Sequence, residues 1–511
     1  MSDWTSGYVT DIGYTFGYYT ELNPQRIKQV FAYAGLKYPE VGAACELGFG
    51  QGMSVNMHAA ASAIEWCGTD FNPAQASFAQ ELAAISGSGA KLFDDSFASF
   101  ANRPDLPDFN FIGVHGIWSW ISDENRSVMV DFIRRKLKVG GILYISYNTL
   151  PGWAAFAPIR HLMTEHAETM GSDGHGIIAR INSALEFSEK LLAANPMFAR
   201  ANPNTADRFK KLKDQNRHYL AHEYFNRDWH PMYFSAMANW LSPAKLTYAC
   251  SAHHLDHIDA INLTNEQIQF LKNIPDGEFR ETVRDFMVNQ QFRRDYWIKG
   301  ARKLPPLEQN ESIRALRIIL LTHRADVPLK VSGTLGEATL SASVYAPILD
   351  FLSDHRIKTI GQIEHALHDK SITLRQIAEA CMVLAGTGHI TLAQDESIAA
   401  KAKKSTDKLN AHLYQHAAVS GDINHLVSPV TGGGIMIGRF QQLFLVALQK
   451  NKKLPAECAQ FAWQILAAQG QKIVKDGKTL DSAEENINEL TEQATLFLEK
   501  QWPILKALQI A

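Results

Sequence analysis

The sequence predicts an α/β fold built on a doubly wound sheet, and three observations in the first 150 residues lead to this prediction. Short apolar segments alternate with segments whose hydrophobic residues recur at helical spacing. A glycine-rich turn at 48–52 joins the first apolar segment to a helical one. Polar side chains follow the later apolar segments. In a parallel sheet such side chains gather at the carboxyl ends of the strands, which is where this fold class binds ligands.

Length and composition are those of an ordinary globular protein. The 511 residues suggest roughly three domains. With 46% hydrophobic residues and a formal net charge of −3, the composition gives no sign of nucleic acid or an anionic membrane as a partner. The five cysteines form no C-x-x-C pair, so we expect neither a zinc site nor a disulfide framework. Without a leader pattern or a long apolar run, the chain is predicted to be a cytoplasmic enzyme with no stable membrane insertion.

The first strand is predicted at 43–47, and the glycine-rich turn after it is the centre of the functional prediction. Three glycines on alternate positions are costly in a regular element, but they suit a sharp turn that a ligand can approach. The helix predicted at 53–64 then offers unpaired N–H groups and the positive end of its dipole to an anionic group. The spacing G-x-G-x-G differs from the G-x-G-x-x-G of dinucleotide-binding proteins, and Glu46 stands two residues before Gly48.

The second strand follows this helix and is expected to end at Asp70. In a doubly wound sheet this position places the Asp70 carboxylate beside the glycine-rich turn. There the carboxylate could accept hydrogen bonds from both ribose hydroxyls of a bound nucleoside. The alternative is a structural role as a cap for the helix that Asn72 and Pro73 would start.

The third and fourth strands are predicted at 91–93 and 109–114. The third runs into the segment 95–97, whose polar groups could reach an adenine edge or could instead cap the next helix. The fourth ends in His115, Gly116 and a tryptophan-containing segment. Four strand ends would thus meet on one side of the sheet, in the crevice where open α/β sheets bind ligands.

The fifth strand is predicted at 142–146, after a helix at 124–137 and a tight turn at 138–141. It leads into the segment 147–153, which contains Tyr147, Asn148 and Trp153. These side chains would therefore stand at the same edge of the sheet as the ends of the other four strands.

Several of these segments resemble the ordered motifs of class I S-adenosylmethionine-dependent methyltransferases. The motifs are the segments 46–52, 95–97 and 137–141 together with Asp70. The segments 115–120, 147–153, 219–226 and 292–300 resemble one methyltransferase family, which carries a so-called regulatory domain and includes bacterial protein-lysine methyltransferases acting on outer-membrane proteins. The resemblance covers residues 8–300 well and the remainder more loosely. The sequence departs from the family where Phe49 replaces the usual Cys, and its N-terminal aromatic segment is not rich in proline.

The resemblance implies a seven-stranded Rossmann-like methyltransferase sheet with S-adenosyl-L-methionine as the cofactor. Methyl transfer from a sulfonium is an in-line displacement, so the protein mainly supplies alignment and a water-poor pocket, contributions of ~7–11 kcal/mol in well-oriented systems. The residues predicted to bind the cofactor are Glu46, Gly48, Gly50, Gln51, Gly52, Asp70, Phe71, Asp95, Ser96, Phe97, His115 and Gly116.

The resemblance also implies a protein lysine as the methyl acceptor. Aromatic faces and amide carbonyls suit this acceptor, because they hold an ammonium by cation–π contact and guide the neutral amine. We predict Tyr147, Asn148 and His115 as catalytic residues, although His115 could relay a proton or simply contact the cofactor, and we favour contact. The predicted substrate-binding residues are Tyr14, Tyr18, Trp118, Trp120, Trp153, His222 and Tyr224, with packing beneath the crevice as the alternative for Trp118 and Trp120.

The first 302 residues are divided into three predicted regions. Residues 1–153 form a lid and the cofactor-binding core, and 154–228 form a helical insertion that covers the active site or makes a homodimer contact. Residues 229–302 form a regulatory segment. A helix at 234–241 is followed by strands at 246–252 and 292–298, which complete the sheet with the last strand antiparallel. The histidines of these regions lack a full ligand set at fixed spacing, so we predict no metal site.

The C-terminal part of the chain is predicted to contain two more regions. Residues 303–400 show helical patterns at 345–352, 360–368 and 373–384, followed by a glycine-turned hairpin, which suggests a winged-helix-like domain. Its third helix has Arg375 as the only lysine or arginine, so protein contact is favoured over DNA. Residues 401–511 are predicted to be a helical domain in which the glycines at 432–434 form a hinge or tight turn.

The sequence thus favours a methyltransferase that acts on protein lysines. The alternative within the same chemistry is a methyltransferase for a small molecule or a surface glycan. A nicotinamide-dependent oxidoreductase is disfavoured by the glycine spacing. An inactive binding protein with the same fold is the remaining alternative.

Overall fold

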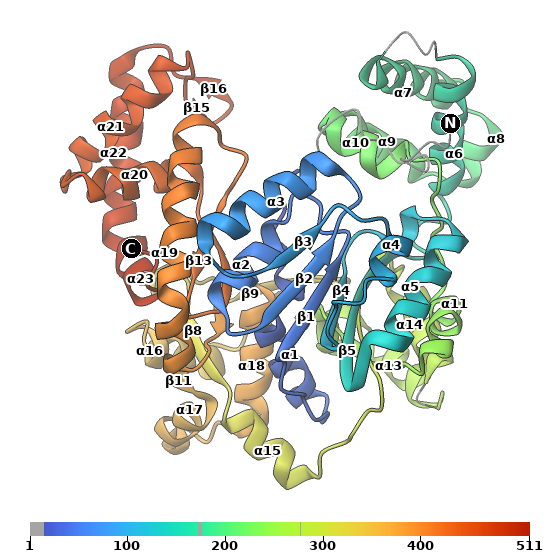
Figure 1. Cartoon of the computed structure of the whole chain (residues 1–511), viewed down its shortest axis with the longest axis horizontal. Coiled ribbons are helices and arrows are strands. Elements are labelled where there is room, and N and C mark those ends of the chain that lie inside the picture. Colours follow the sequence, from blue (N-terminus) through green and yellow to red (C-terminus); the bar gives the residue numbers. More distant parts are fainter. Residues whose placement is uncertain (1–14, 172–175, 276) are drawn as a thin grey trace.

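The computed structural model of the chain describes residues 15–171, 176–275 and 277–511 (Figure 1). At its centre lies a seven-stranded sheet with the order β3-β2-β1-β4-β5-β7-β6. The strands are β1 (Ala43–Leu47), β2 (Glu65–Thr69), β3 (Lys91–Phe93), β4 (Phe109–Val114), β5 (Leu137–Asn148), β6 (Thr247–Ser251) and β7 (Phe292–Ile298). β1 to β5 are parallel, whereas β7 is antiparallel to both of its neighbours. The predicted sheet, including its two late strands, is confirmed.

Helices cover both faces of this sheet, because neighbouring strand residues point to opposite faces and each face is apolar. One face packs against α1 (Pro24–Tyr33), α2 (Met53–Ala61) and α3 (Pro73–Ser86). The other packs against α4 (Phe97–Ala101), α5 (Asp123–Lys136) and α11 (Phe234–Leu241). In β1 neighbouring residues alternate between the two faces. Ala44 packs into the core beneath α1, α2 and α3, and Cys45 packs into the core beneath α4, α5 and α11.

The prediction of a tight turn at 138–141 is wrong. These residues belong to β5, which begins directly after α5 and pairs with β4 from Leu137 onward, with a register shift beside Phe109 and Phe111. Gly140 adopts a positive φ of 81°, and its N–H donates to the carbonyl of Lys299. The glycines therefore permit an irregular extended stretch rather than a chain reversal.

The insertion after β5 is helical, as predicted, and has a core of its own. It contains α6 (Ala157–Thr169), α7 (Ile177–Ala193), α8 (Met197–Ala201), α9 (Thr205–Lys213) and α10 (Arg217–Tyr224). Its core joins Trp153 and Phe156 to apolar residues of α6, α7, α9 and α10. In Figure 1 this unit sits beyond the carboxyl ends of the parallel strands, which brings α10 above the edge of the sheet.

The segment between β6 and β7 is also mostly helical. It contains α12 (Asp259–Asn262), α13 (Asn265–Lys272) and α14 (Glu278–Val288). Because β7 runs antiparallel to β5, its first residues lie beside the end of β5, where Phe292 pairs with Asn148. The regulatory segment thereby reaches the ligand-binding edge of the sheet.

The next region contains the three predicted helices but not the predicted hairpin. The helices are α16 (Ala342–Leu352), α17 (Ile360–Ala366) and α18 (Leu374–Gly386), and α15 (Pro306–Arg314) precedes them. The strand β12 (Ile390–Leu392) pairs with β8 (Arg317–Leu320), which comes before these helices, and β11 (Lys358–Thr359) pairs with β8 on its other side. β9 (Lys330–Gly333) and β10 (Gly336–Thr339) form a separate hairpin. The hairpin expectation fails because Gly388, with a φ of 80°, turns the chain toward β8, and the winged-helix assignment stays a prediction.

The C-terminal region packs against two helices of the central sheet. It contains the helices α19 (Glu396–Val419), α20 (Arg439–Gln449), α21 (Pro455–Ala468), α22 (Ala483–Leu496) and α23 (Trp502–Ala507), and the strands β13 (His425–Ser428), β14 (Gly433–Met436), β15 (Val474–Lys475) and β16 (Lys478–Thr479). Its apolar core includes Met53 and Met57 of α2 and Leu82 of α3. Gly432 forms part of the tight turn between β13 and β14, with a φ of 73°. The predicted domain boundaries at 153, 228, 302 and 400 stay predictions.

None of the helices in the described part of the chain combines the length and the hydrophobicity needed to cross a bilayer. The cytoplasmic location and the possible homodimer stay predictions.

Candidate active site at the carboxyl edge of the sheet

A cavity of about 400 Å³ lies at the carboxyl ends of β1, β2, β4 and β5. We call it the cleft. Of the residues predicted from the sequence, those that line it are Glu46, Gly48, Gly50, Gln51, Asp70, Phe71, Phe97, His115, Gly116, Trp120, Asn148, Trp153 and His222. Residues that are far apart in the sequence thus meet where strand order predicts a ligand-binding crevice.

The glycine-rich turn forms one wall of the cleft. Gly48, Gly50 and Gly52 all have positive φ values, between 57° and 71°, which favour glycine. A Cβ atom on Gly48 would lie 2.6 Å from the Ile117 side chain, and one on Gly52 would overlap the Cβ atom of Ala79. The turn therefore requires glycine for conformation and for space, and it ends at Gly52, the N-cap of α2.

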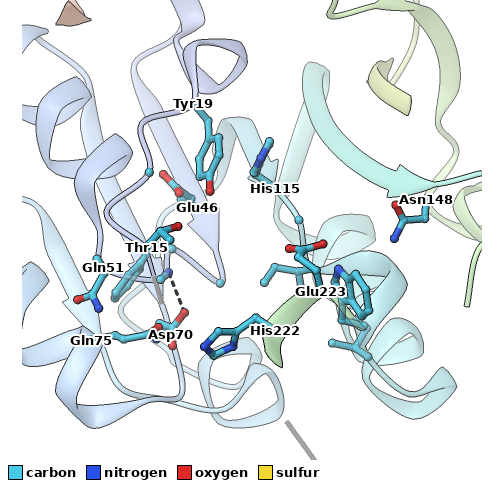
Figure 2. Close-up of a pocket in the computed structure, with 18 of the residues that line it drawn as sticks. Thr15, Tyr19, Glu46, Gln51, Asp70, Gln75, His115, Asn148, His222 and Glu223 are labelled. Atoms are coloured by element: carbon cyan, nitrogen blue, oxygen red, sulfur yellow. Dashed lines mark hydrogen bonds between the residues drawn. The ribbon is translucent and has the colours of Figure 1, made fainter. Parts of the chain in front are cut away.

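Asp70 is held beside this turn by two hydrogen bonds from backbone N–H groups. The Gly50 N–H donates to Oδ2 at 2.8 Å (Figure 2). The Asn72 N–H donates to Oδ1 at 3.0 Å. Burial raises the pKa of Asp70 to about 6, against the lowering effect of the two hydrogen bonds. The N-cap of α3 is Asn72, whose side chain accepts from the Ala74 N–H, so the Asp70 carboxylate remains turned toward the cleft.

Glu46 lies deeper in the same wall and is only 2% exposed. Burial, reinforced by the nearby Asp70 carboxylate, raises the pKa of Glu46 to about 8. Within the described residues, its buried Oε2 atom has no hydrogen-bond partner. The cleft thus contains a carboxyl group that a cationic ligand would help to ionise.

His115 forms the middle of the cleft between two tyrosines. Its ring stacks on Tyr19 with 3.7 Å between ring centroids, and its Nδ1 lies 2.7 Å from the Tyr144 hydroxyl. Burial lowers the pKa of His115 to about 4, so the imidazole is neutral at physiological pH. The adjacent Gly116 N–H donates to Ser146 Oγ at 2.8 Å. These contacts fix the position of the imidazole at the end of β4.

The opposite wall comes from the ends of the later strands and from the insertion. Asn148 is held at the end of β5 by its N–H, which donates to Ser119 Oγ at 2.8 Å. Tyr219, His222 and Glu223 of α10 also line this wall. They share one helix face, because residues three and four positions apart are neighbours on a helix. Figure 2 shows Glu223 across the cleft from Glu46.

The chain is 39% identical to the uncharacterized protein sll1526 of Synechocystis sp. over 513 aligned residues, which cover 99% of this chain and 100% of that protein. Residues 216–299 match the family described as the predicted methyltransferase regulatory domain. The chain belongs to this family of methyltransferases with a regulatory domain. The matched residues run from the last helix of the insertion through β7.

The fold of this methyltransferase is also found in PKMT2 of Rickettsia typhi. The TM-score is 0.69 for PKMT2 in complex with AdoHcy and 0.67 for a second structure of PKMT2, and each comparison covers 98% of this chain and 100% of that chain. The sequence identity is 15%, so this likeness shows the fold alone. A protein from Rickettsia prowazekii is 26% identical over 59% of this chain and 54% of its own length.

Three predicted cofactor-binding residues of the methyltransferase do not line the cleft. Asp95 pairs with Arg103 at 2.9 Å, and Ser96 is the N-cap of α4, where its Oγ accepts from the Ser99 N–H. Ser96 therefore caps the next helix, which was the alternative to a contact with the adenine. Gly52 is shielded by α3 and instead starts α2.

Four predicted catalytic or substrate-binding residues also lie outside the cleft. Tyr147 points to the opposite face of β5, where its buried hydroxyl donates to Asp295 Oδ2 at 2.9 Å. Trp118 is fully buried in the same core, and its indole N–H faces Met232 Sδ at 3.4 Å, so packing is its role in the fold. Tyr224 turns away from the Glu223 face of α10 and packs on Trp153. Tyr18 packs between His58 of α2 and His425 of β13 in the C-terminal region.

The prediction for Tyr14 lies outside the described residues. The lining residues that were missed include Tyr19, Glu223 and Phe292. Tyr19 is adjacent to the predicted Tyr18, and alternation along an extended segment would have selected one or the other. Glu223 is adjacent to the predicted His222. Phe292 starts β7, and the predicted antiparallel direction of this strand already implied that its first residue stands beside the end of β5.

Within the described residues, no group of three or more His, Cys, Asp or Glu side chains is arranged to hold a metal ion. The cleft has carboxyl, imidazole, amide and aromatic groups for its chemistry. This set suits the binding and alignment of an organic ligand.

Proposed function

We propose that this protein transfers a methyl group from S-adenosyl-L-methionine to the side-chain amine of a lysine in a protein. One observation carries the proposal: among the described residues that line the cleft there are three carboxyl groups and no lysine or arginine. A cleft of this composition favours two cationic reactants, a sulfonium and an ammonium, because a bound cation also helps the buried Glu46 to ionise, and it disfavours anionic acceptors such as phosphates.

The nucleoside of the cofactor is assigned to the β1–β2 side of the cleft. The Asp70 carboxylate accepts the ribose hydroxyls there, because each of its oxygens retains a free lone pair beside the existing N–H contact. Phe71 and Phe97 offer aromatic faces to the adenine. With the ribose at the end of β2, the sulfonium points along the sheet edge toward His115 at the end of β4.

The acceptor is assigned to the wall formed by β5, α10 and the start of β7. The half-buried Glu223 carboxylate attracts the lysine ammonium, and Trp120, Trp153 and Phe292 supply aromatic faces around it. The ammonium must lose a proton to solvent water before its lone pair can attack the methyl carbon. The new C–N bond forms as the C–S bond breaks, and the sulfur keeps that electron pair as the thioether of S-adenosylhomocysteine.

Asn148 and His115 align this reaction in the proposal. The Asn148 amide oxygen accepts a hydrogen bond from the amine and thereby directs its lone pair. His115 contacts the cofactor rather than relaying a proton, because a neutral imidazole with a pKa near 4 is a weak base. The name of the structural neighbour PKMT2 suggests lysine as the acceptor, in agreement with the family resemblance of the sequence.

The test uses the purified protein, a methyl-labelled cofactor and a cell extract, with mass spectrometry to locate the label. Label on lysine Nε is the expected result, and synthetic peptides with the same sites should accept methyl groups, whereas peptides with glutamine in place of lysine should not. Label on a saccharide or a small molecule, with none on lysine, would reject lysine as the acceptor but would still support methyl transfer from the cofactor. Absence of cofactor binding would reject the proposal entirely.

A further inference from the structure

Residues 15–19 run between the cleft and the C-terminal region without helix or sheet pairing, and the Gly17 N–H donates to the Thr15 carbonyl at 3.0 Å. Thr15, Gly17 and Tyr19 line the cleft. Phe16 and Tyr18 pack instead against the apolar core of the C-terminal region. The odd-numbered residues of this segment thus face the cleft, and the two even-numbered side chains face the C-terminal region. We call this segment the strap.

The even-numbered side chains anchor the strap. The Phe16 ring lies 5.3 Å from the ring of Phe78 in α3 and 6.0 Å from that of His416 in α19. The Tyr18 ring lies 5.1 Å from His425 in β13, and its hydroxyl lies 3.0 Å from His58 Nε2. Burial lowers the pKa of His58 to about 3 and raises that of Tyr18, so a neutral hydroxyl donates to a neutral imidazole.

The β13–β14 hairpin fits tightly over this anchor. A Cβ atom on Gly433 would overlap the Tyr18 hydroxyl. One on Gly434 would lie 2.8 Å from Met57 Sδ and 3.0 Å from the Tyr18 ring. The Asn23 side-chain amide, just after the strap, donates to the Thr431 carbonyl at 3.3 Å. The hairpin therefore leaves Tyr18 little freedom to move.

The adjacent Tyr19 is held over the cleft. Its N–H donates to Ser54 Oγ at 2.8 Å, and its ring stacks on His115. A Cβ atom on Gly17 would lie 2.5 Å from the Tyr19 hydroxyl, so the ring folds back over the glycine. In Figure 2 the ring stands next to Glu46 and His115, on the side of the cleft away from Asp70.

We propose that Tyr19 binds the sulfonium half of the cofactor and that the C-terminal hairpin, acting through Tyr18, positions it there. This inference rests on the proposed cofactor. A tyrosine face attracts a cation most strongly when water is excluded, and the strap is the wall that closes the cleft on this side. Tyr18 and Gly433 are positioning residues, and Tyr19 is the residue that touches the ligand. The C-terminal region thus contributes to the site without lining it.

The experiment compares binding of S-adenosylmethionine with binding of adenosine, which lacks the sulfur and the methionine part. Tyr19→Ala should weaken S-adenosylmethionine binding about tenfold or more while adenosine binding changes less than about twofold. Tyr19→Phe keeps the ring and should bind both ligands as the unchanged protein does. Asp70→Ala, at the ribose, should weaken both ligands.

The positioning role is tested with the hairpin. Gly433→Ala should displace Tyr18 and reproduce the selective loss of S-adenosylmethionine binding. The double variant Gly433→Ala/Tyr18→Phe lacks the overlapping hydroxyl. Because the added Cβ atom would also lie 2.8 Å from Asn23 Nδ2, the double variant should recover part of the affinity. Gly176→Ala is the matched control, because a Cβ atom there meets nothing within 4 Å and the backbone is not left-handed.

The outcomes separate this inference from the proposed function. If the unchanged protein binds no S-adenosylmethionine, the proposed function fails. If it binds the cofactor but Tyr19→Ala binds it equally well, only the role of Tyr19 is rejected. An equal loss of adenosine and S-adenosylmethionine in Gly433→Ala, or no recovery in the double variant, would reject the positioning role.

Discussion

The two walls of the cleft are built in different ways. The wall proposed to bind the cofactor, the cofactor wall, comes from one short stretch of chain, in which Glu46, the glycine-rich turn and Asp70 end two adjacent parallel strands. The wall proposed to bind the methyl acceptor, the acceptor wall, combines residues from the segment after β4, the end of β5, α10 and the start of β7. A local motif therefore specifies the first wall, whereas the second exists only once distant segments have folded together. Variants of the two walls should accordingly fail in different steps.

The largest effect is expected from Asp70→Ala in the cofactor wall. The variant loses the acceptor for the ribose hydroxyls and leaves the Gly50 N–H without its partner. Two hydrogen bonds to a carboxylate, each worth about 1.5–3 kcal/mol, correspond to a loss of cofactor affinity of roughly 100-fold or more. Calorimetric titration with S-adenosylhomocysteine measures this effect. Unchanged affinity would mean that the nucleoside lies elsewhere.

A smaller and different effect is expected from Glu223→Gln in the acceptor wall. The substitution removes the charge that attracts the ammonium but keeps the size of the side chain, so KM for a lysine peptide should rise about tenfold. Affinity for S-adenosylhomocysteine should not change. Glu186→Gln is the matched control, since Glu186 lies in the same insertion but pairs with Lys190 on the surface. A loss of cofactor affinity in Glu223→Gln would contradict the division into two walls.

A third effect depends on pH and belongs to the cofactor wall alone. Asp70 and Glu46 have pKa values raised to about 6 and about 8, so both become anionic as the pH rises through these values. Anionic carboxylates favour the sulfonium of S-adenosylmethionine over the neutral thioether of S-adenosylhomocysteine. The ratio of the two affinities should therefore rise several-fold between about pH 5 and pH 9.

Glu46→Gln provides the control for this titration. The variant should lose the upper part of the rise, near pH 8, and keep the lower part, which belongs to Asp70. Binding of each ligand measured across the same pH range gives the ratio directly. A ratio that stays flat with pH in the unchanged protein would show that the sulfonium does not lie close enough to these carboxyl groups to be attracted by their charge.

The same contrast explains how much the sequence could predict. The first four parallel strands and the Asp70 position follow from local patterns of apolar and polar residues, and the structure has them as predicted, whereas β5 starts earlier than predicted. The acceptor wall was predicted less well, because a sequence pattern places residues on an element without saying which face meets a distant helix. Glu223 was missed and Tyr224 was included for this reason. Helix geometry separates the two tyrosines of α10. Tyr219 lines the cleft, and Tyr224, five positions later, lies on a different face of the helix.

Tyr147 shows the same limit in a strand. Tyr147 and Asn148 were predicted together as catalytic residues, yet neighbours in a strand point to opposite faces. Only Asn148 lines the cleft, whereas Tyr147 enters the core cluster on the other face. The alternation was visible in the sequence, but the choice between the two faces depended on β7, which is remote in sequence and pairs with β5.

The smallest effect on activity is therefore expected from Tyr147→Phe. The variant loses the hydrogen bond to Asp295, which keeps its ion pair with Arg293 at 2.9 Å. The free energy of unfolding should fall by about 1–2 kcal/mol, because a buried acceptor loses one donor. Since the hydroxyl lies outside the cleft, kcat for a lysine peptide should remain within about threefold of the unchanged protein, a difference below 1 kcal/mol. Chemical denaturation and steady-state kinetics on one preparation measure both quantities. A large loss of kcat at unchanged stability would instead support the prediction that Tyr147 is a catalytic residue.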